Sequence, residues 1–236
     1  ERGELVLYFQ PQFELGSRRI LGCEALVRWN HPTQGLVAPD AFIPIAEKSG
    51  LILAVDDWVL RQACRQMQDW RRRTGYDMQI AVNISAIHFR REGLVERVKH
   101  ALDESGLPPQ HLELELTESA IMENAERAAT VLGALRGMGV RIAIDDFGTG
   151  YSSLAYLKRF EADVIKIDRF FVKQLDADMN DQAIVCAIIQ MAKSMGSVVI
   201  AEGIETEACA ALLHRLGCAR GQGFWMSRPL SADVFA

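Results

Sequence analysis

The chain has 236 residues, 49% of them hydrophobic, and a formal net charge of −5. This length and composition suffice for one large core and suit an α/β barrel, so we expect a single domain over residues 1–236. The acidic balance gives no reason to expect a nucleic-acid polymer as partner. No apolar run approaches the roughly 18 residues of a membrane span.

The cysteines point to the compartment of the protein. They are five in number and scattered through apolar runs. That usage is typical of reduced core thiols, so we expect a cytoplasmic protein. Because the chain starts at Glu1 rather than at Met, we also expect it to come from a longer protein, whose other segments could anchor it to a membrane.

The first third of the chain predicts an antiparallel pair of strands followed by two helices. Residues 5–13 alternate enough to form a first strand, and a short turn leads into a second strand over residues 20–28. A connection this short joins antiparallel strands but cannot provide a parallel crossover. A short helix is expected from Asp40, and apolar residues at helical spacing predict a longer one over residues 56–73.

Strands and helices alternate in the rest of the chain. The predicted strands cover residues 79–85, 112–116, 141–146, 164–168, 197–202 and 222–225, and the predicted helices cover residues 94–104, 125–138, 153–160, 182–195 and 207–216. This alternation predicts an α/β fold, a modified (β/α)8 barrel with an antiparallel first strand. A doubly wound open sheet is the alternative, which the absence of a glycine-rich nucleotide motif weakens.

The most informative stretch is RIAIDDFGTGYSS, which begins at Arg141. A buried strand leads to two adjacent carboxylates, Asp145 and Asp146, and then to a glycine-rich loop. Two like charges about 4 Å apart repel by roughly 4 kcal/mol at an effective dielectric near 20. Either one carboxylate is protonated or a cation lies between them. The alternative is that one of them caps the next helix.

Other predicted strands also end in polar residues, at the end of the barrel where barrel enzymes build their sites. Helix capping explains Ser, Thr, Asp and Asn there, but not glutamates inside apolar strands, where unpaired carboxylates are disfavoured. A ligand set of carboxylates and one amide, without His or Cys, indicates Mg²⁺ or Mn²⁺. The residues at these strand ends are Glu24, Asn83, Glu115, Glu118, Asp145, Asp146, Lys166, Asp168, Glu202, Glu205 and Gln222.

Two basic residues accompany these acids. Lys166 is expected to stay protonated, either positioning a metal-bound water or forming a salt bridge with Asp145 or Glu202, and the two roles are compatible. Arg28 lies on the same face of its strand as Glu24. A salt bridge between Arg28 and Glu24 is the simplest interpretation of that pair.

An ordered set of motifs runs from Tyr8 to Arg228. It comprises YFQP, Glu24-Ala25-Leu26 with Arg28, RWNHP, FIPIAE, Asn83-Ile84-Ser85, ELTES, DDFGTGYSS, KID, EGIE, QGF and RPL. In these motifs the chain resembles the EAL-domain phosphodiesterases, bacterial signalling domains that linearise cyclic di-GMP. The resemblance implies hydrolysis to linear 5′-pGpG with two ions of Mg²⁺ or Mn²⁺ per site, in a domain of a longer multidomain signalling protein.

The resemblance also implies roles for individual positions. Positions that match metal ligands are Glu24, Asn83, Glu115, Asp145, Asp146 and Glu202, with Asp145 bridging the two ions. Lys166 matches the lysine that helps to activate the attacking water, beside Glu202, and Glu118 matches a glutamate that steadies the glycine-rich loop. Positions on the substrate side are Gln10, Arg28, Asp168, Glu205 and Gln222. The planar fork of an arginine suits a phosphate.

Two further expectations follow from the resemblance. Members of the family often pair through the glycine-rich loop and its following helix, so a homodimer through Asp146 to Phe160 is expected. Some members are silent cyclic di-GMP receptors or interaction domains, and these typically lose metal ligands or break the loop motif. Every motif position that can be placed here carries the expected residue type, which favours an enzyme. A barrel hydrolase acting on another phosphodiester is a further alternative.

Overall fold

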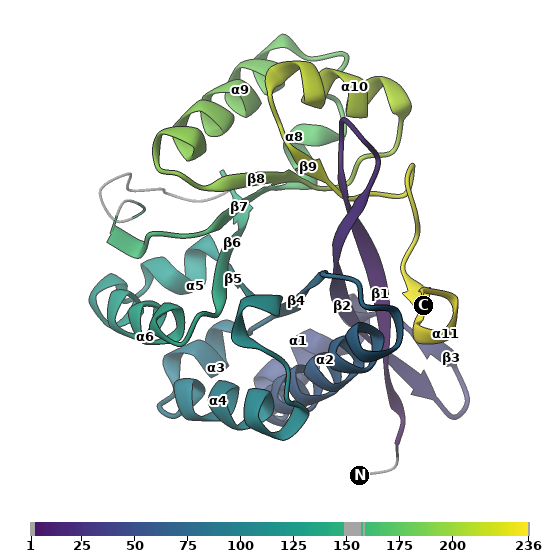
Figure 1. Cartoon of the computed structure of the whole chain (residues 1–236), viewed down its shortest axis with the longest axis vertical. Helices are drawn as coiled ribbons and strands as arrows, with labels where there is room; N and C mark the ends of the chain where they lie inside the picture. The colour runs from purple at the N-terminus through teal and green to yellow at the C-terminus, as the bar shows by residue number, and fades with distance from the viewer. Residues whose placement is uncertain (1–2, 149–156, 158, 236) are drawn as a thin grey trace.

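Figure 1 shows the computed structural model, which describes residues 3–148, 157 and 159–235. The strands are β1 (Leu5–Glu14), β2 (Ile20–His31), β3 (Gly35–Val37), β4 (Gln79–Asn83), β5 (Leu112–Thr117), β6 (Arg141–Phe147), β7 (Val164–Ile167), β8 (Val198–Ala201), β9 (Arg220–Gly221) and β10 (Leu230–Ser231). The helices are α1 (Pro39–Ser49), α2 (Ile52–Thr74), α3 (Ala86–Arg90), α4 (Leu94–Ser105), α5 (Glu118–Met122), α6 (Ala125–Gly137), α8 (Arg169–Val172), α9 (Met179–Ser194), α10 (Glu207–Leu216) and α11 (Ala232–Phe235). None of these helices combines the length and apolarity that a membrane crossing requires.

The described strands close into a barrel. They pair in the order β10-β1-β9-β8-β7-β6-β5-β4-β2-β3, and a further pairing of β1 with β2 joins the two ends of the eight-stranded ring. From β2 through β4 to β9 the neighbours are parallel, whereas β1 is antiparallel to both β2 and β9. The predicted barrel with an antiparallel first strand is confirmed, and the open-sheet alternative is wrong.

The helices surround this ring, and most of the apolar core lies between them and the outer faces of the strands (Figure 1). In β5, for example, Leu112, Leu114 and Leu116 belong to this outer core. Because side chains alternate along a strand, Glu113 and Glu115 point into the barrel instead. The alternation of apolar and acidic residues along β5 thus places its acidic side chains in the interior of the barrel.

Several predicted boundaries differ from the structure. The helix predicted over residues 207–216 is confirmed at both ends, while the two-residue strand β9 precedes the predicted strand at residues 222–225. The latter residues instead fold against Ile204, whose N–H donates to Gln222 O and whose carbonyl accepts from Trp225 N. The sequence also gave no sign of the short helices α3, α5 and α8. The helix predicted at residues 153–160 and most of the predicted dimer contact lie outside the described residues.

Candidate active site

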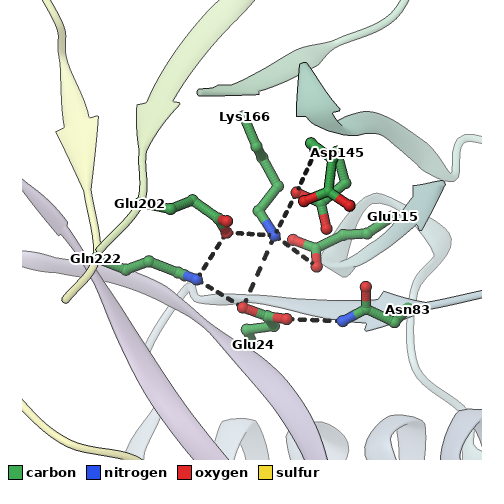
Figure 2. Close-up of polar contacts among 8 residues, drawn as sticks. Glu24, Asn83, Glu115, Asp145, Lys166, Glu202 and Gln222 are labelled. Carbon is green, nitrogen blue, oxygen red and sulfur yellow. Dashed lines mark hydrogen bonds and ion pairs between the residues drawn. The ribbon is translucent and has the colours of Figure 1, made fainter. Parts of the chain in front are cut away.

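Seven polar side chains converge at the carboxyl ends of neighbouring barrel strands (Figure 2). Their positions follow from the parallel arrangement, because parallel strands place their carboxyl ends at one mouth of the barrel. They come in order from β2, β4, β5, β6 and β7 and from the segments after β8 and β9. The residues are Glu24, Asn83, Glu115, Asp145, Lys166, Glu202 and Gln222.

Lys166 lies at the centre of the cluster and is 1% exposed. Its Nζ atom is 2.8 Å from Glu115 Oε2, 2.7 Å from Glu202 Oε1 and 3.3 Å from Asp145 Oδ1. Burial opposes the charge, but the surrounding carboxylates raise the pKa of Lys166 well above its ordinary value. The expected ion pairs of Lys166 with Asp145 and with Glu202 are therefore both present.

Glu24 is held by two amide donors. Asn83 Nδ2 donates to Glu24 Oε1 at 2.7 Å, and Gln222 Nε2 donates to Glu24 Oε2 at 2.6 Å and to Glu202 Oε1 at 2.9 Å. Burial works to raise the pKa of Glu24, yet the charge of Lys166 and these donors lower it overall. Glu24 is therefore an ionised carboxylate, and the cation that lowers its pKa is Lys166.

The expected salt bridge between Glu24 and Arg28 is wrong. Arg28 Nη1 donates instead to the carbonyl of Val27 at 2.9 Å, and the guanidinium lies 5.9 Å from the ring centroid of Tyr8. Glu24 takes its partners from other strands, because barrel closure brings Asn83 and Gln222 against it. Arg28 thus forms no salt bridge with a carboxylate of the described residues, although the charges of Glu24 and Asp40 act on it from further away.

The two adjacent aspartates reach the same side of the sheet. Consecutive residues of a strand normally point to opposite faces, but Asp146 has a φ of 54°. This left-handed conformation is uncommon for a residue with a side chain, although Asp adopts it more readily than most, and Arg18 and Glu161 share it in this chain. One oxygen each of Asp145, Asp146 and Glu202 then lie within 4.8 Å of one another.

This crowding of carboxylates changes their proton affinity. Burial, the charge of Asp145 and the hydrogen bond and charge of Asp168 raise the pKa of Asp146 to about 6. Burial raises the pKa of Glu202 to about 8, and the charges of Asp145 and Glu24 add to the effect against the opposing charge of Lys166. A single lysine does not neutralise the cluster.

The family model of the EAL domain matches residues 1–229. This chain belongs to the EAL domain family. The bifunctional diguanylate cyclase/cyclic di-GMP phosphodiesterase MucR of Pseudomonas aeruginosa is 48% identical over 233 residues, which are 99% of this chain and 34% of MucR. The cyclic di-GMP phosphodiesterase NbdA of the same organism is 46% identical over 227 residues, 96% of this chain and 29% of NbdA. The chain therefore spans about a third of the length of these relatives.

A solved structure of the PaMucR phosphodiesterase in complex with c-di-GMP has the same fold as this EAL domain. It gives a TM-score of 0.97 at 48% identity and covers 100% of this chain and 95% of its own. The EAL enzyme Bd1971, in its form bound to cAMP and cyclic di-GMP, gives a TM-score of 0.93 at 38% identity, covering 99% of this chain and 64% of its own. The family predicted from the motifs and the barrel predicted from the alternation of strands and helices are confirmed.

The donors of this EAL domain fit a hard divalent cation. All the candidate ligands offer carboxylate or amide oxygens, which suit Mg²⁺ and Mn²⁺. Glu115 is 1% exposed, and its Oε1 atom has no hydrogen-bond partner. A buried carboxylate oxygen without a donor is costly, and burial together with Glu24 raises the pKa of Glu115 well above its usual value. A cation would satisfy that oxygen and neutralise the cluster.

Four further predicted residues lie around this centre. Glu118 begins α5 and accepts from Gly148 N at 3.3 Å, at the entrance to the glycine-rich loop. Asp168 caps α8 by accepting from Phe170 N at 2.7 Å. Gln10 pairs with Glu24 in register across β1 and β2. Glu205 is exposed and lines a cavity of about 840 Å³ with Asp168, so the structure leaves it at the edge of the site.

Sequence reasoning missed one buried acid near the site, Asp56 in α2. In the sequence it stands only at the start of a predicted helix. Its spacing to Val59, Leu60 and Ala63 (i, i+3, i+4, i+7) puts it on the apolar stripe of that helix, and the structure buries all four residues. An acid on a buried stripe is the signal that identifies it.

Proposed function

We propose that this EAL domain hydrolyses cyclic di-GMP to linear 5′-pGpG with the help of Mg²⁺ or Mn²⁺. The observation that carries the proposal is the cluster of carboxylates around Lys166 at the carboxyl mouth of the barrel. Two relatives in which this domain is 46–48% identical are named cyclic di-GMP phosphodiesterases. The PaMucR phosphodiesterase that shares its fold is complexed with c-di-GMP.

The metal would be held by the residues that the geometry brings together. Glu24, Asn83, Glu115 and Asp145 would form one position, and Asp145 would bridge to a second position with Asp146 and Glu202. When bound, two divalent cations lower the pKa of a water molecule and neutralise the charge that develops on the attacking and leaving oxygens of a phosphodiester.

The protein side chains supply orientation and charge. Lys166 places a buried ammonium among Glu115, Glu202 and Asp145, the residues that would hold the metal, so a water bound by that metal would lie within its reach. Arg28 is half-buried and forms no salt bridge with a carboxylate of the described residues, so its planar fork can donate to a phosphate. Gln10 lies beside Glu24 on the neighbouring strand β1 and can donate to the substrate. Both N–H groups of the Gln222 amide already bond to Glu24 and Glu202, which leaves its Oε1 atom as an acceptor.

Product analysis tests the proposal directly. The chain is incubated with cyclic di-GMP and Mg²⁺ or Mn²⁺, with or without EDTA, and the nucleotides are separated by chromatography. We expect 5′-pGpG to appear in the reactions without EDTA and to be absent when EDTA chelates the divalent ion. Cyclic di-GMP that binds and is recovered intact in the presence of both ions would refute hydrolysis and favour a receptor domain.

A further inference from the structure

A buried polar contact lies directly behind the strand end that carries Asn83. Asp56, near the start of α2, is only 6% exposed. Its Oδ2 atom accepts hydrogen bonds from Ser85 Oγ at 2.6 Å and from the backbone N–H of Ser85 at 3.1 Å. Because a buried carboxylate is costly without such donors, these two bonds hold Ser85 firmly against α2.

Ser85 controls the path of the chain as it leaves β4. Asn83 is the last residue of that strand, and the next residue, Ile84, donates its N–H to the carbonyl of Glu115 at 2.9 Å. Ser85 Oγ also accepts from His88 N at 3.2 Å and so caps α3. The segment after β4 is thus fastened to β5 through Ile84 and to α2 through Ser85.

The orientation of Asn83 depends on this segment. Its Nδ2 atom donates to Glu24 at 2.7 Å, so Oδ1 is the atom left for a cation. Asn83 is the last residue of β4, and the two residues after it fix its backbone, Ile84 through its bond to β5 and Ser85 through its bonds to Asp56. We propose that Asp56 is a positioning residue that keeps Asn83 in its ligand orientation through Ser85. The inference rests on the proposed function of Asn83 as a metal ligand.

The surrounding packing separates this role from general stability. α2 and β4 meet through apolar side chains, including Val59 and Leu60 on the helix and Val82 on the strand, all of them buried. Loss of the Asp56 carboxylate would leave these contacts in place. His88 Nδ1 lies 3.3 Å from Asp56 Oδ2 and its ring is 1% exposed, so the contact is enclosed on its other side as well.

A Mn²⁺ titration without nucleotide tests the inference, with free Mn²⁺ measured by electron paramagnetic resonance. The variants are Asp56→Ala, Asp56→Asn, Ser85→Ala and Asn83→Ala. Asp163→Ala is the matched control, because Asp163 Oδ2 likewise accepts from a backbone N–H, that of Ile142 at 3.0 Å, but at the start of β6. Melting temperatures in EDTA are recorded for every variant.

We expect Asp56→Ala and Asn83→Ala to weaken Mn²⁺ binding by roughly 10- to 100-fold, the usual effect of losing a group that orients a ligand. Ser85→Ala should change affinity in the same direction and serves if Asp56→Ala does not fold. Asp56→Asn, which keeps an acceptor oxygen, should restore most of the affinity. Asp163→Ala should lower the melting temperature but leave Mn²⁺ affinity within about twofold of wild type. At saturating Mn²⁺ the turnover of Asp56→Ala should approach that of wild type.

Two results would overturn the inference while leaving the proposed function intact. One is wild-type Mn²⁺ affinity in Asp56→Ala and Ser85→Ala when Asn83→Ala binds weakly. The other is an equal loss of affinity in Asp163→Ala, which would point to general loosening of the barrel. Wild-type affinity in Asn83→Ala would instead refute the ligand assignment on which the positioning role depends.

Discussion

At the scale of single residues, the site is defined by one cation among several buried carboxylates. Lys166 contacts Glu115, Glu202 and Asp145 and is also 3.7 Å from Glu24 Oε2. A buried ion pair is weak evidence for stability in itself, because desolvation offsets the attraction, but removal of one partner leaves uncompensated charge. Lys166 is therefore expected to be needed both for folding without metal and for catalysis.

Lys166→Met tests that expectation. Without divalent ions, the variant should lose about 3–5 kcal/mol of unfolding free energy, since its carboxylate partners stay buried without a cation. Added Mg²⁺ should recover part of the loss, while turnover stays strongly reduced. Urea unfolding with EDTA or Mg²⁺ measures the first effect and product formation the second. Lys99→Met, at an exposed position in α4, is the control and should match wild type. Equal urea midpoints for the two variants would contradict the argument.

Glu24 and Glu113 both point into the barrel, but only Glu24 belongs to the site. Glu24 bonds with Asn83 and Gln222 within the cluster, whereas Glu113 pairs with Arg141 Nε at 3.3 Å. Glu24→Gln should reduce turnover by at least about 100-fold, through loss of a ligand charge. Glu113→Gln should retain turnover within a few-fold. Steady-state assays at saturating Mn²⁺, with circular dichroism to verify folding, provide the measurement. Near-normal activity of Glu24→Gln would refute its assignment as a ligand.

At the scale of elements, strand alternation made much of the site predictable. Glu115, Asp145 and Lys166 each lie in a strand long enough to show its period. The face of the strand from which each side chain points, and its place at the carboxyl end, could therefore be predicted from sequence. Gln222 follows a strand of two residues, which is too short to show any period, and its strand was misplaced. Helices of four or five residues, such as α3, α5 and α8, were missed for the same reason.

Contacts between distant elements were not predictable in this way. The hydrogen-bond partners of Glu24 lie up to 198 positions away in the chain, so local pattern suggested Arg28 instead. The role of Asp56 also depends on a strand end 29 positions away. In both cases the side chain itself was visible in the sequence, but its partner was set by barrel closure. The motif resemblance supplied the roles that spacing alone left open.

The loop that carries Gln222 depends on a close backbone approach. A Cβ atom at Gly223 would lie 2.2 Å from both Ile204 N and Ile204 O, so Gly223→Ala must displace one of the two segments. We expect a loss of roughly 1–3 kcal/mol in unfolding free energy from such overpacking. Turnover should also fall, because Gln222 would lose its bonds to Glu24 and Glu202.

Gly133→Ala is the matched control for this glycine. It lies inside α6, where an added Cβ would meet no atom of the described residues within 4 Å beyond the adjoining helix backbone, and alanine should stabilise the helix by about 0.5–1 kcal/mol. Urea unfolding of both variants gives the comparison. A stable and fully active Gly223→Ala would show that the 203–206 segment can move without disturbing the site.

At the scale of the whole molecule, closure of the barrel concentrates negative charge at one mouth. Raised pKa values of Asp146, about 6, and of Glu202, about 8, mean that the folded protein binds protons more tightly than the unfolded chain, whose carboxyls titrate near 4. Unfolding free energy should therefore fall as pH rises from about 5 to about 8 when metal is absent. The lowered pKa of Glu24 has the opposite sign, but its effect lies below this range.

Divalent metal should reverse this dependence, because it binds the ionised carboxylates and stabilises the folded state by mass action. We expect the difference in melting temperature between Mg²⁺ and EDTA to grow from pH 5.5 to pH 8. Histidines and other groups away from the site contribute equally with and without metal, so the difference isolates the cluster. Glu202→Gln removes the group that titrates near 8 and should flatten the curve in EDTA. Parallel curves with and without Mg²⁺ would refute a link between metal binding and this cluster.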